Sequence, residues 1–152
     1  MRYAQQTSVS VEKSKAEIER LLMKYDAAKF GLGWDLVGAT IGFQLSGRYI
    51  RFTLPLPDKG SKEFMYTQEK KRMRSTEESL KAWEQACRQK WRALALVIKA
   101  KLEAVESGIT TFEDEFMANI VMPGGKTVSE MVRPEIAQAY ESGKPLQLMA
   151  GY

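Results

Sequence analysis

Basic and aromatic residues in this sequence have the chemistry of a phosphate-binding surface. Residues 59–101 contain twelve Lys/Arg and five Asp/Glu, whereas residues 103–141 contain two and eight. Such charge separation attracts an anionic ligand to the basic region. Arginine forks bind phosphate oxygens, and an aromatic plane stacks on a nucleobase. The candidate ligand-binding residues are Trp34, Arg48, Tyr49, Arg51, Lys70, Lys71, Arg72, Arg74, Arg88 and Arg92.

The helical part of this basic segment also has a simpler interpretation. Arg88, Arg92 and Lys99 recur at positions that share one face of a helix. A charged helix face is most often a solvated surface without a ligand. Both interpretations stay open at the level of sequence.

The residue types that are missing exclude several kinds of chemistry. The chain has no histidine and a single cysteine, Cys87. A histidine-based catalytic triad, a Cys/His zinc site and an intrachain disulfide are therefore excluded. We expect no cofactor, no bound metal and no enzymatic activity. The net charge of +4 and the pI near 9.1 permit nucleic-acid binding without requiring it.

One motif points to an alternative, a metal-dependent nuclease. Pro57-Asp58 followed by Glu69-Lys70-Lys71 has the order of a signature in which two carboxylates hold a divalent metal and a lysine helps to activate water. Those carboxylates belong on adjoining strands, but here they bound a polar loop. Metal catalysis needs fixed ligand geometry, so this interpretation is the less favoured one.

Local patterns predict an α+β fold, in which an antiparallel sheet packs against one long amphipathic helix. Period-two alternation predicts a three-stranded meander over 29–36, 39–45 and 48–54. Tyr49 and Arg51 should point away from the core. Apolar residues at steps of three or four predict the long helix over 76–107, ended by Gly108. That helix is longer than a small core, so one end should project or pack against another subunit.

The N-terminal and loop segments are predicted from caps and composition. A strand over 3–11 should precede an N-terminal helix over 12–26, for which Ser14 and Glu17 have the spacing of a capping box. Residues 58–74 are polar and basic and should form a mobile surface loop.

The C-terminal part should be a small helical and hairpin segment. Thr110 is predicted to cap a short helix, and two short strands should flank a turn at 123–125. A last helix should run from Thr127 through Tyr140, bent or restarted at Pro134. All of these elements fit a single domain over residues 1–152.

The sequence AWEQACRQKWR at 82–92 continues as ALALVIKAKLEAVESGITTFEDEF to Phe116. Together with residues 7–12 and GRYIRF at 47–52, it resembles a family of small proteins encoded in phage and prophage genomes. Small accessory phage proteins often act on host defences or on phage DNA. The resemblance therefore implies counter-defence or DNA metabolism in the host bacterial cytoplasm, but it carries no site residues.

We therefore expect a non-enzymatic binding protein that sequesters a phosphate-bearing nucleotide or blocks a host defence protein. A DNA/RNA-binding accessory protein, the metal nuclease and a structural virion component are the alternatives. A homo-oligomer is expected, because pockets between subunits can enclose small ligands. No segment resembles a signal peptide or a membrane span, and the lone cysteine fits a reducing cytoplasm.

Overall fold

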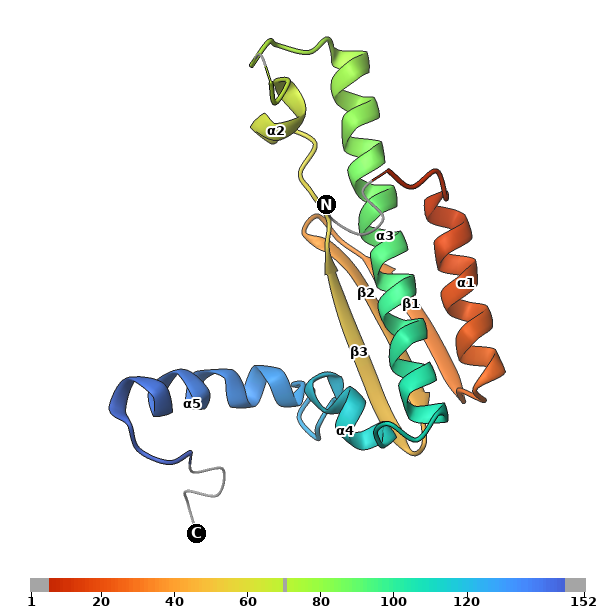
Figure 1. Cartoon of the computed structure of the whole chain (residues 1–152), viewed down its shortest axis with the longest axis vertical. Helices are drawn as coiled ribbons and strands as arrows, with labels where there is room; N and C mark the ends of the chain where they lie inside the picture. Colours follow the sequence, from red (N-terminus) through yellow and green to blue (C-terminus); the bar gives the residue numbers. More distant parts are fainter. Residues whose placement is uncertain (1–5, 70, 147–152) are drawn as a thin grey trace.

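The computed structural model describes residues 6–69 and 71–146 and has an α+β fold, as predicted (Figure 1). The antiparallel sheet has the strand order β1-β2-β3. The elements in chain order are α1 (Val11–Lys24), β1 (Lys29–Trp34), β2 (Gly38–Leu45), β3 (Arg48–Pro55), α2 (Lys62–Met65), α3 (Thr76–Glu106), α4 (Phe112–Phe116), the short 3-10 helix η1 (Met117–Asn119) and α5 (Val128–Ser142).

The predicted meander and long helix are confirmed within a few residues. Ser46 and Gly47 have φ values of 50° and 74°, as in the two-residue turn that matches the twist of antiparallel strands. Ile41 and Phe43 are paired with Phe52 and Ile50, which places all four on the buried face. The long helix ends just before Gly108, whose φ is 79°.

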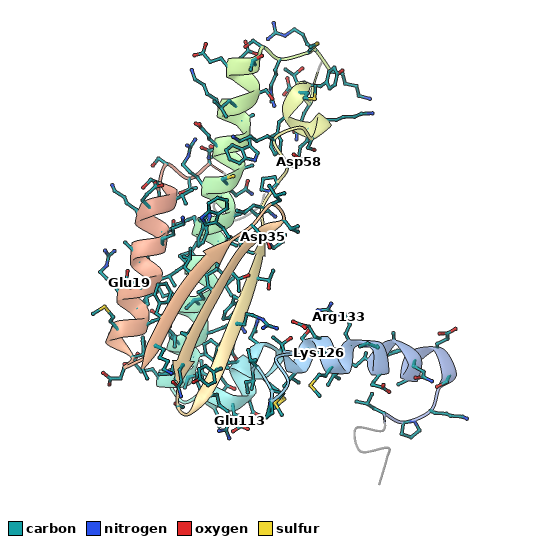
Figure 2. All side chains as sticks on the ribbon, turned by 180° about the vertical axis from the view of Figure 1, so that it is seen from behind. Glu19, Asp35, Asp58, Glu113, Lys126 and Arg133 are labelled. Atoms are coloured by element: carbon teal, nitrogen blue, oxygen red, sulfur yellow. The ribbon has the colours of Figure 1, made fainter. Side chains whose placement is uncertain are left out.

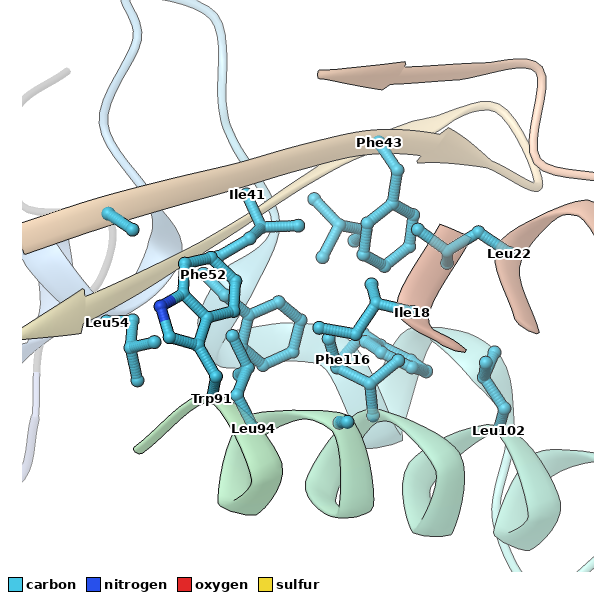
Figure 3. Close-up of a cluster of buried hydrophobic side chains, with 14 of the residues drawn as sticks. Ile18, Leu22, Ile41, Phe43, Phe52, Leu54, Trp91, Leu94, Leu102 and Phe116 are labelled. Atoms are coloured by element: carbon cyan, nitrogen blue, oxygen red, sulfur yellow. The ribbon is translucent and has the colours of Figure 1, made fainter. Parts of the chain in front are cut away.

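Helices α1 and α3 lie side by side on one face of the sheet (Figure 1). The core between the layers is filled by apolar side chains of all three strands and both helices (Figure 3). Phe116 of α4 is completely buried, and its ring meets Phe43 and Phe52 edge-on at centroid distances of 6.1 and 6.3 Å. Helix α4 therefore closes one end of the core, while the beginning of α3 extends past the other (Figure 1).

The predicted N-terminal strand is wrong in its described part. Residues 6–10 form no strand, and Val11 already belongs to α1. Ser10, not Ser14, is the cap, because its hydroxyl accepts a hydrogen bond from the Lys13 amide. Ser14 instead lies inside the helix, fully buried. Local bonds such as that from the Val9 amide to Thr7 Oγ1 compete with strand pairing here. Residues 3–5 lie outside the described part.

The predicted mobile loop at 58–74 is instead organised. It contains α2 and an isolated bridge between Tyr66 and Met73. Phe64 is buried, and the Arg74 guanidinium donates 3.2 Å hydrogen bonds to the backbone oxygens of Glu63 and Phe64. One buried aromatic side chain and one arginine therefore hold α2 near the start of α3, and composition did not reveal this.

The C-terminal segment needs smaller corrections. Thr111, one residue later than predicted, caps α4. The two predicted strands are single bridges, Ile50 to Ile120 and Val121 to Thr127. Thr127 caps α5 as predicted, but α5 continues through Pro134 without restarting. Helix α5 then projects from the body beyond β3 (Figure 1).

Candidate functional site

The structure does not gather the predicted basic residues into one surface. Arg51 points away from the core, as predicted, but pairs with Glu130 at 2.9 Å. Arg48 lies 3.9 Å from Glu113 at the opposite end of β3 from the α2 region. Tyr49 is exposed on the outer face, where its hydroxyl accepts a hydrogen bond from Lys29. The contacts of Arg51 and Arg48 therefore join the sheet to the C-terminal segment, whereas the contact of Tyr49 stays within the sheet.

The helix and loop arginines are also engaged within the chain. Arg92 forms an ion pair with Glu17 that joins α3 to α1. Arg72 lies 4.0 Å from Glu78. Arg74, as described above, holds α2. Lys71, with a φ of 47°, lies in the loop beside Arg72, and Lys70 falls outside the described residues. A single surface made of all ten candidates is therefore wrong.

Two of the candidates, Trp34 and Arg88, do line one pocket of about 770 Å³. Its walls come from the start of α1, the β1–β2 loop, the segment after β3 and the middle of α3. Figure 2 shows two of its residues, Asp35 and Asp58, at the end of the sheet from which α3 extends. This volume lies within the range of roughly 300–1,000 Å³ that is typical of small-molecule sites.

All three tryptophans of the chain, Trp34, Trp83 and Trp91, line this pocket, and we call it the tryptophan pocket. Trp34 is 78% exposed at its edge. Trp83 is fixed by the 2.7 Å hydrogen bond that its indole N–H donates to the Pro57 oxygen. The pocket therefore offers one free aromatic plane and one that is held in place.

Trp91 forms the deep wall and has an unused donor. It is only 3% exposed, and no acceptor for its indole N–H occurs among the described residues. Figure 3 shows that the ring nitrogen lies on the side of Trp91 away from Ile18, toward Leu54. Although the ring is largely buried, the indole nitrogen itself is not fully enclosed, so its N–H can donate to water or to a ligand that enters the pocket.

Three cations line the tryptophan pocket without an ion pair in the described part of the chain, namely Lys15, Lys59 and Arg88. The Lys15 ammonium lies 4.9 Å from the Trp91 ring centroid, and that of Lys59 lies 4.5 Å from the Trp83 centroid. Arg88 donates two hydrogen bonds, of 2.6 and 3.0 Å, to the side-chain oxygen of Gln85. Gln85 thus orients the guanidinium. Because the Gln85 side chain is neutral, the positive charge of Arg88 is not neutralised by this contact.

Four carboxylates also line the pocket, and two of them are occupied by their own loops. Asp35 accepts hydrogen bonds from the amides of Val37 and Gly38 at 2.8 and 3.0 Å. Asp58 accepts from Gly60 at 3.1 Å. The other two are Glu12 and Glu84. The pocket therefore contains both positive and negative side chains. Anion binding depends on the positions of the three cations within it and not on the net charge of the pocket.

Lys15 and Lys59 were not among the candidate ligand-binding residues predicted from the sequence. Lys15 belongs to α1 and Lys59 to the segment after β3. They reach the pocket only because the fold brings both segments next to α3. The spacing of Trp83 and Trp91, two helical turns apart, was the one local signal for the pocket, but it is equally typical of core residues.

Cys87 lies in the wall of the pocket but is not set up as a nucleophile. Burial raises the pKa of its thiol, and the nearby charges of Lys59 and Arg88 oppose that shift only in part. The thiol form is therefore favoured, as expected for a small buried hydrophobe.

The nuclease motif is not assembled as a metal centre. Over residues 6–69 and 71–146, no three or more Cys, Asp or Glu side chains form a group that could hold a metal ion. Within the same ranges, no helix is both long and apolar enough to cross a membrane.

Comparison of the chain with protein-family models, curated proteins and solved structures found no match. Function must therefore be argued from the tryptophan pocket itself.

Proposed function

We propose that this protein binds a phosphate-bearing nucleotide in the tryptophan pocket and acts by sequestering it, without chemical conversion. The observation that carries this proposal is the convergence of three tryptophans, an unused indole donor and three cations without ion pairs on one pocket.

The aromatic residues suit the base. A nucleobase has two π faces and several acceptor atoms at its edge, and stacking on an aromatic side chain contributes about 1–3 kcal/mol per base. Trp34 at the rim is free to stack, because most of its surface is exposed. The indole N–H of Trp91 can donate to a ring nitrogen or carbonyl oxygen of a base that enters the pocket.

The cations suit the phosphate. Arg88 keeps part of its guanidinium available, since its hydrogen bonds to Gln85 come from Nε and Nη2. Lys15 and Lys59 stand over tryptophan rings, so their ammonium groups are held near the pocket. A phosphate between such groups gains charge-assisted hydrogen bonds. Glu12 and Glu84 limit how much negative charge the pocket accepts, which favours a ligand with few phosphates.

Capture of a nucleotide fits the cellular role that the phage resemblance suggests. Sequestration of a host nucleotide signal in the bacterial cytoplasm would counter a defence pathway without any catalytic group. This role rests on the proposed binding and extends it to the host.

The direct test is calorimetric titration of the protein with cyclic and linear nucleotides, alongside tryptophan fluorescence. Every tryptophan lines the pocket, so fluorescence should change when a ligand enters. A nucleotide should bind more tightly than its nucleoside, which lacks the phosphate contacts, and more tightly than inorganic phosphate, which lacks the contacts of the base. At a hundred times its dissociation constant, the ligand should stabilise the fold by about 2.7 kcal/mol.

Two variants locate the site. Trp34→Ala should weaken binding by about 1–3 kcal/mol, or roughly 5- to 150-fold, through lost stacking. Lys59→Gln should weaken nucleotide binding but not nucleoside binding, whereas the control Lys29→Gln on the outer face of the sheet should leave both unchanged. Absence of binding to all nucleotides would contradict the proposal. Binding only to long single strands, with a steep fall in affinity at higher salt, would instead favour the nucleic-acid-binding alternative.

A further inference from the structure

The sheet has an outer face, which does not pack on α1 and α3. No helix of residues 6–69 and 71–146 covers this face (Figures 1 and 2). Strand alternation and register place small and polar residues on it and no Asp or Glu. We call it the glycine face. Its residues are Lys29, Gly31, Gly33, Thr40, Gly42, Gln44, Tyr49, Arg51 and Thr53.

The three glycines on this face are not required by the fold of one chain. None of them has a positive φ. A Cβ atom at Gly31 or Gly33 would meet nothing within 4 Å, and at Gly42 it would meet only the Ile50 oxygen at 3.8 Å. Glycine in a strand costs about 0.5–1 kcal/mol relative to alanine. Such glycines often mark a place where another surface approaches the backbone closely.

Helix α5 is a second surface that is left largely exposed in the described part of the chain. It has no buried residue along its fifteen positions. Val128 packs against the core of its own chain, and beyond it Val132, Ile136 and Tyr140 continue at steps of four as an apolar stripe. Ile136 is 45% exposed and Tyr140, at the far end, is 88% exposed. Most helical stability in proteins comes from packing of such a stripe, so a projecting helix of this kind is incomplete on its own.

We propose that the glycine face receives helix α5 of a second copy, in a two-fold dimer in which each chain lays its α5 across the sheet of the other. A two-fold arrangement covers the glycine faces and the apolar stripes of both chains. Neither surface then remains free to bind a third chain, so assembly stops at the dimer. The absence of side chains at the glycines lets the helix approach the sheet closely. A sheet face is normally completed by such a second layer.

The dimensions and charges of the two surfaces match. Fifteen helical residues span about 22 Å, and the eight-residue strands β2 and β3 span about 26 Å. Arg51 and Glu130 pair with each other within one chain. Apart from them, helix α5 has two glutamates and one arginine, whereas the glycine face has Lys29 and no carboxylate. The ion pair between Arg51 and Glu130 already joins the first turn of α5 to this face within one chain, which fixes where the helix departs.

The test is the oligomeric state of the full chain, measured by sedimentation velocity over a range of concentrations. The native sequence should dimerise. Gly31→Val should raise the dimer dissociation constant at least tenfold while the monomer stays folded, because the new side chain has room and valine favours strands. Ile136→Glu should do the same from the other side. The matched control Ile109→Glu changes an exposed isoleucine elsewhere and should leave the dimer intact.

Cross-linking shows which chain supplies the helix. Thr40→Cys in one chain and Ile136→Cys in another should form an interchain disulfide when the two variants are mixed under oxidation. The proposal is overturned if the native chain is a monomer at every concentration, or if the dimer survives both Gly31→Val and Ile136→Glu. A disulfide that forms only within a single monomeric chain carrying both cysteines would also overturn it, because α5 would then fold back on its own sheet.

Discussion

Ser14→Ala should stabilise this protein. Replacing a serine at the start of a helix usually lowers the free energy of unfolding, because such a serine often caps the helix. The Ser14 side chain is fully buried inside α1, and its hydroxyl oxygen has no hydrogen-bond partner among the described residues. The residue that caps α1 is Ser10, one turn earlier. The two serines therefore make a matched pair in which the same chemical change should have opposite effects.

The expected size follows from the two environments. Removing a buried polar group that lacks a partner recovers a desolvation penalty of about 1–3 kcal/mol. Alanine also has a higher helix propensity than serine, by up to about 0.7 kcal/mol. The small space left by the hydroxyl offsets part of this gain, so we expect the free energy of unfolding to rise by about 1–2 kcal/mol. Ser10→Ala should lower it by about 1 kcal/mol through loss of the cap.

Urea denaturation of the native chain and the two variants measures both effects, with thermal unfolding as a second readout. A gain of 1–2 kcal/mol in a chain of this length raises the melting temperature by roughly 2–8 °C. A fall in stability on Ser14→Ala, of the size seen for Ser10→Ala, would refute the reasoning. It would mean that the Ser14 hydroxyl has a partner or acts as the cap.

Three further predictions concern the core, a titration and a helix contact. Phe116→Ala should lower the free energy of unfolding by about 3–5 kcal/mol in denaturant titrations, whereas Phe112→Ala, at a partly buried site of the same helix, should cost less. The hydrogen bond that the Tyr25 hydroxyl donates to Glu106 raises the pKa of Tyr25 from 10.0 to about 12. The folded state thus holds this proton more tightly than the unfolded state, so its stabilising effect is complete below pH 10 and is lost as the pH rises toward 12. Tyr25→Phe should reduce that decline in unfolding curves measured over this pH range, and an unchanged decline would contradict the assignment. Arg92→Met should lower stability by more than the exposed control Arg72→Met, because its ion pair with Glu17 is mostly shielded from water, and equal losses would contradict this.

The sequence by itself determined the elements whose signals are local. Alternating apolar residues predicted the strands around Ile41 and Phe52, because the side-chain period of a strand is two wherever one face is buried. The presence of Gly47 and Gly108 predicted the hairpin turn and the end of α3, and both glycines have a positive φ in the structure. These features depend on backbone geometry over a few residues, and the structure confirms them.

Only the tertiary structure decided which polar residues have partners. Ser10 and Ser14 look alike as helix starts, and the packing of α1 on α3 determines that one caps while the other is buried. Arg51 resembled a ligand-binding residue until Glu130, far along the chain, was found to pair with it.

The tryptophan pocket likewise joins Trp34 with Trp83 and Trp91 from segments that are distant in sequence. The physical reason is that hydrogen bonds, ion pairs and cavities form between surfaces brought together by folding. Composition and periodicity describe each surface separately, so they predict its character but not the surface it meets.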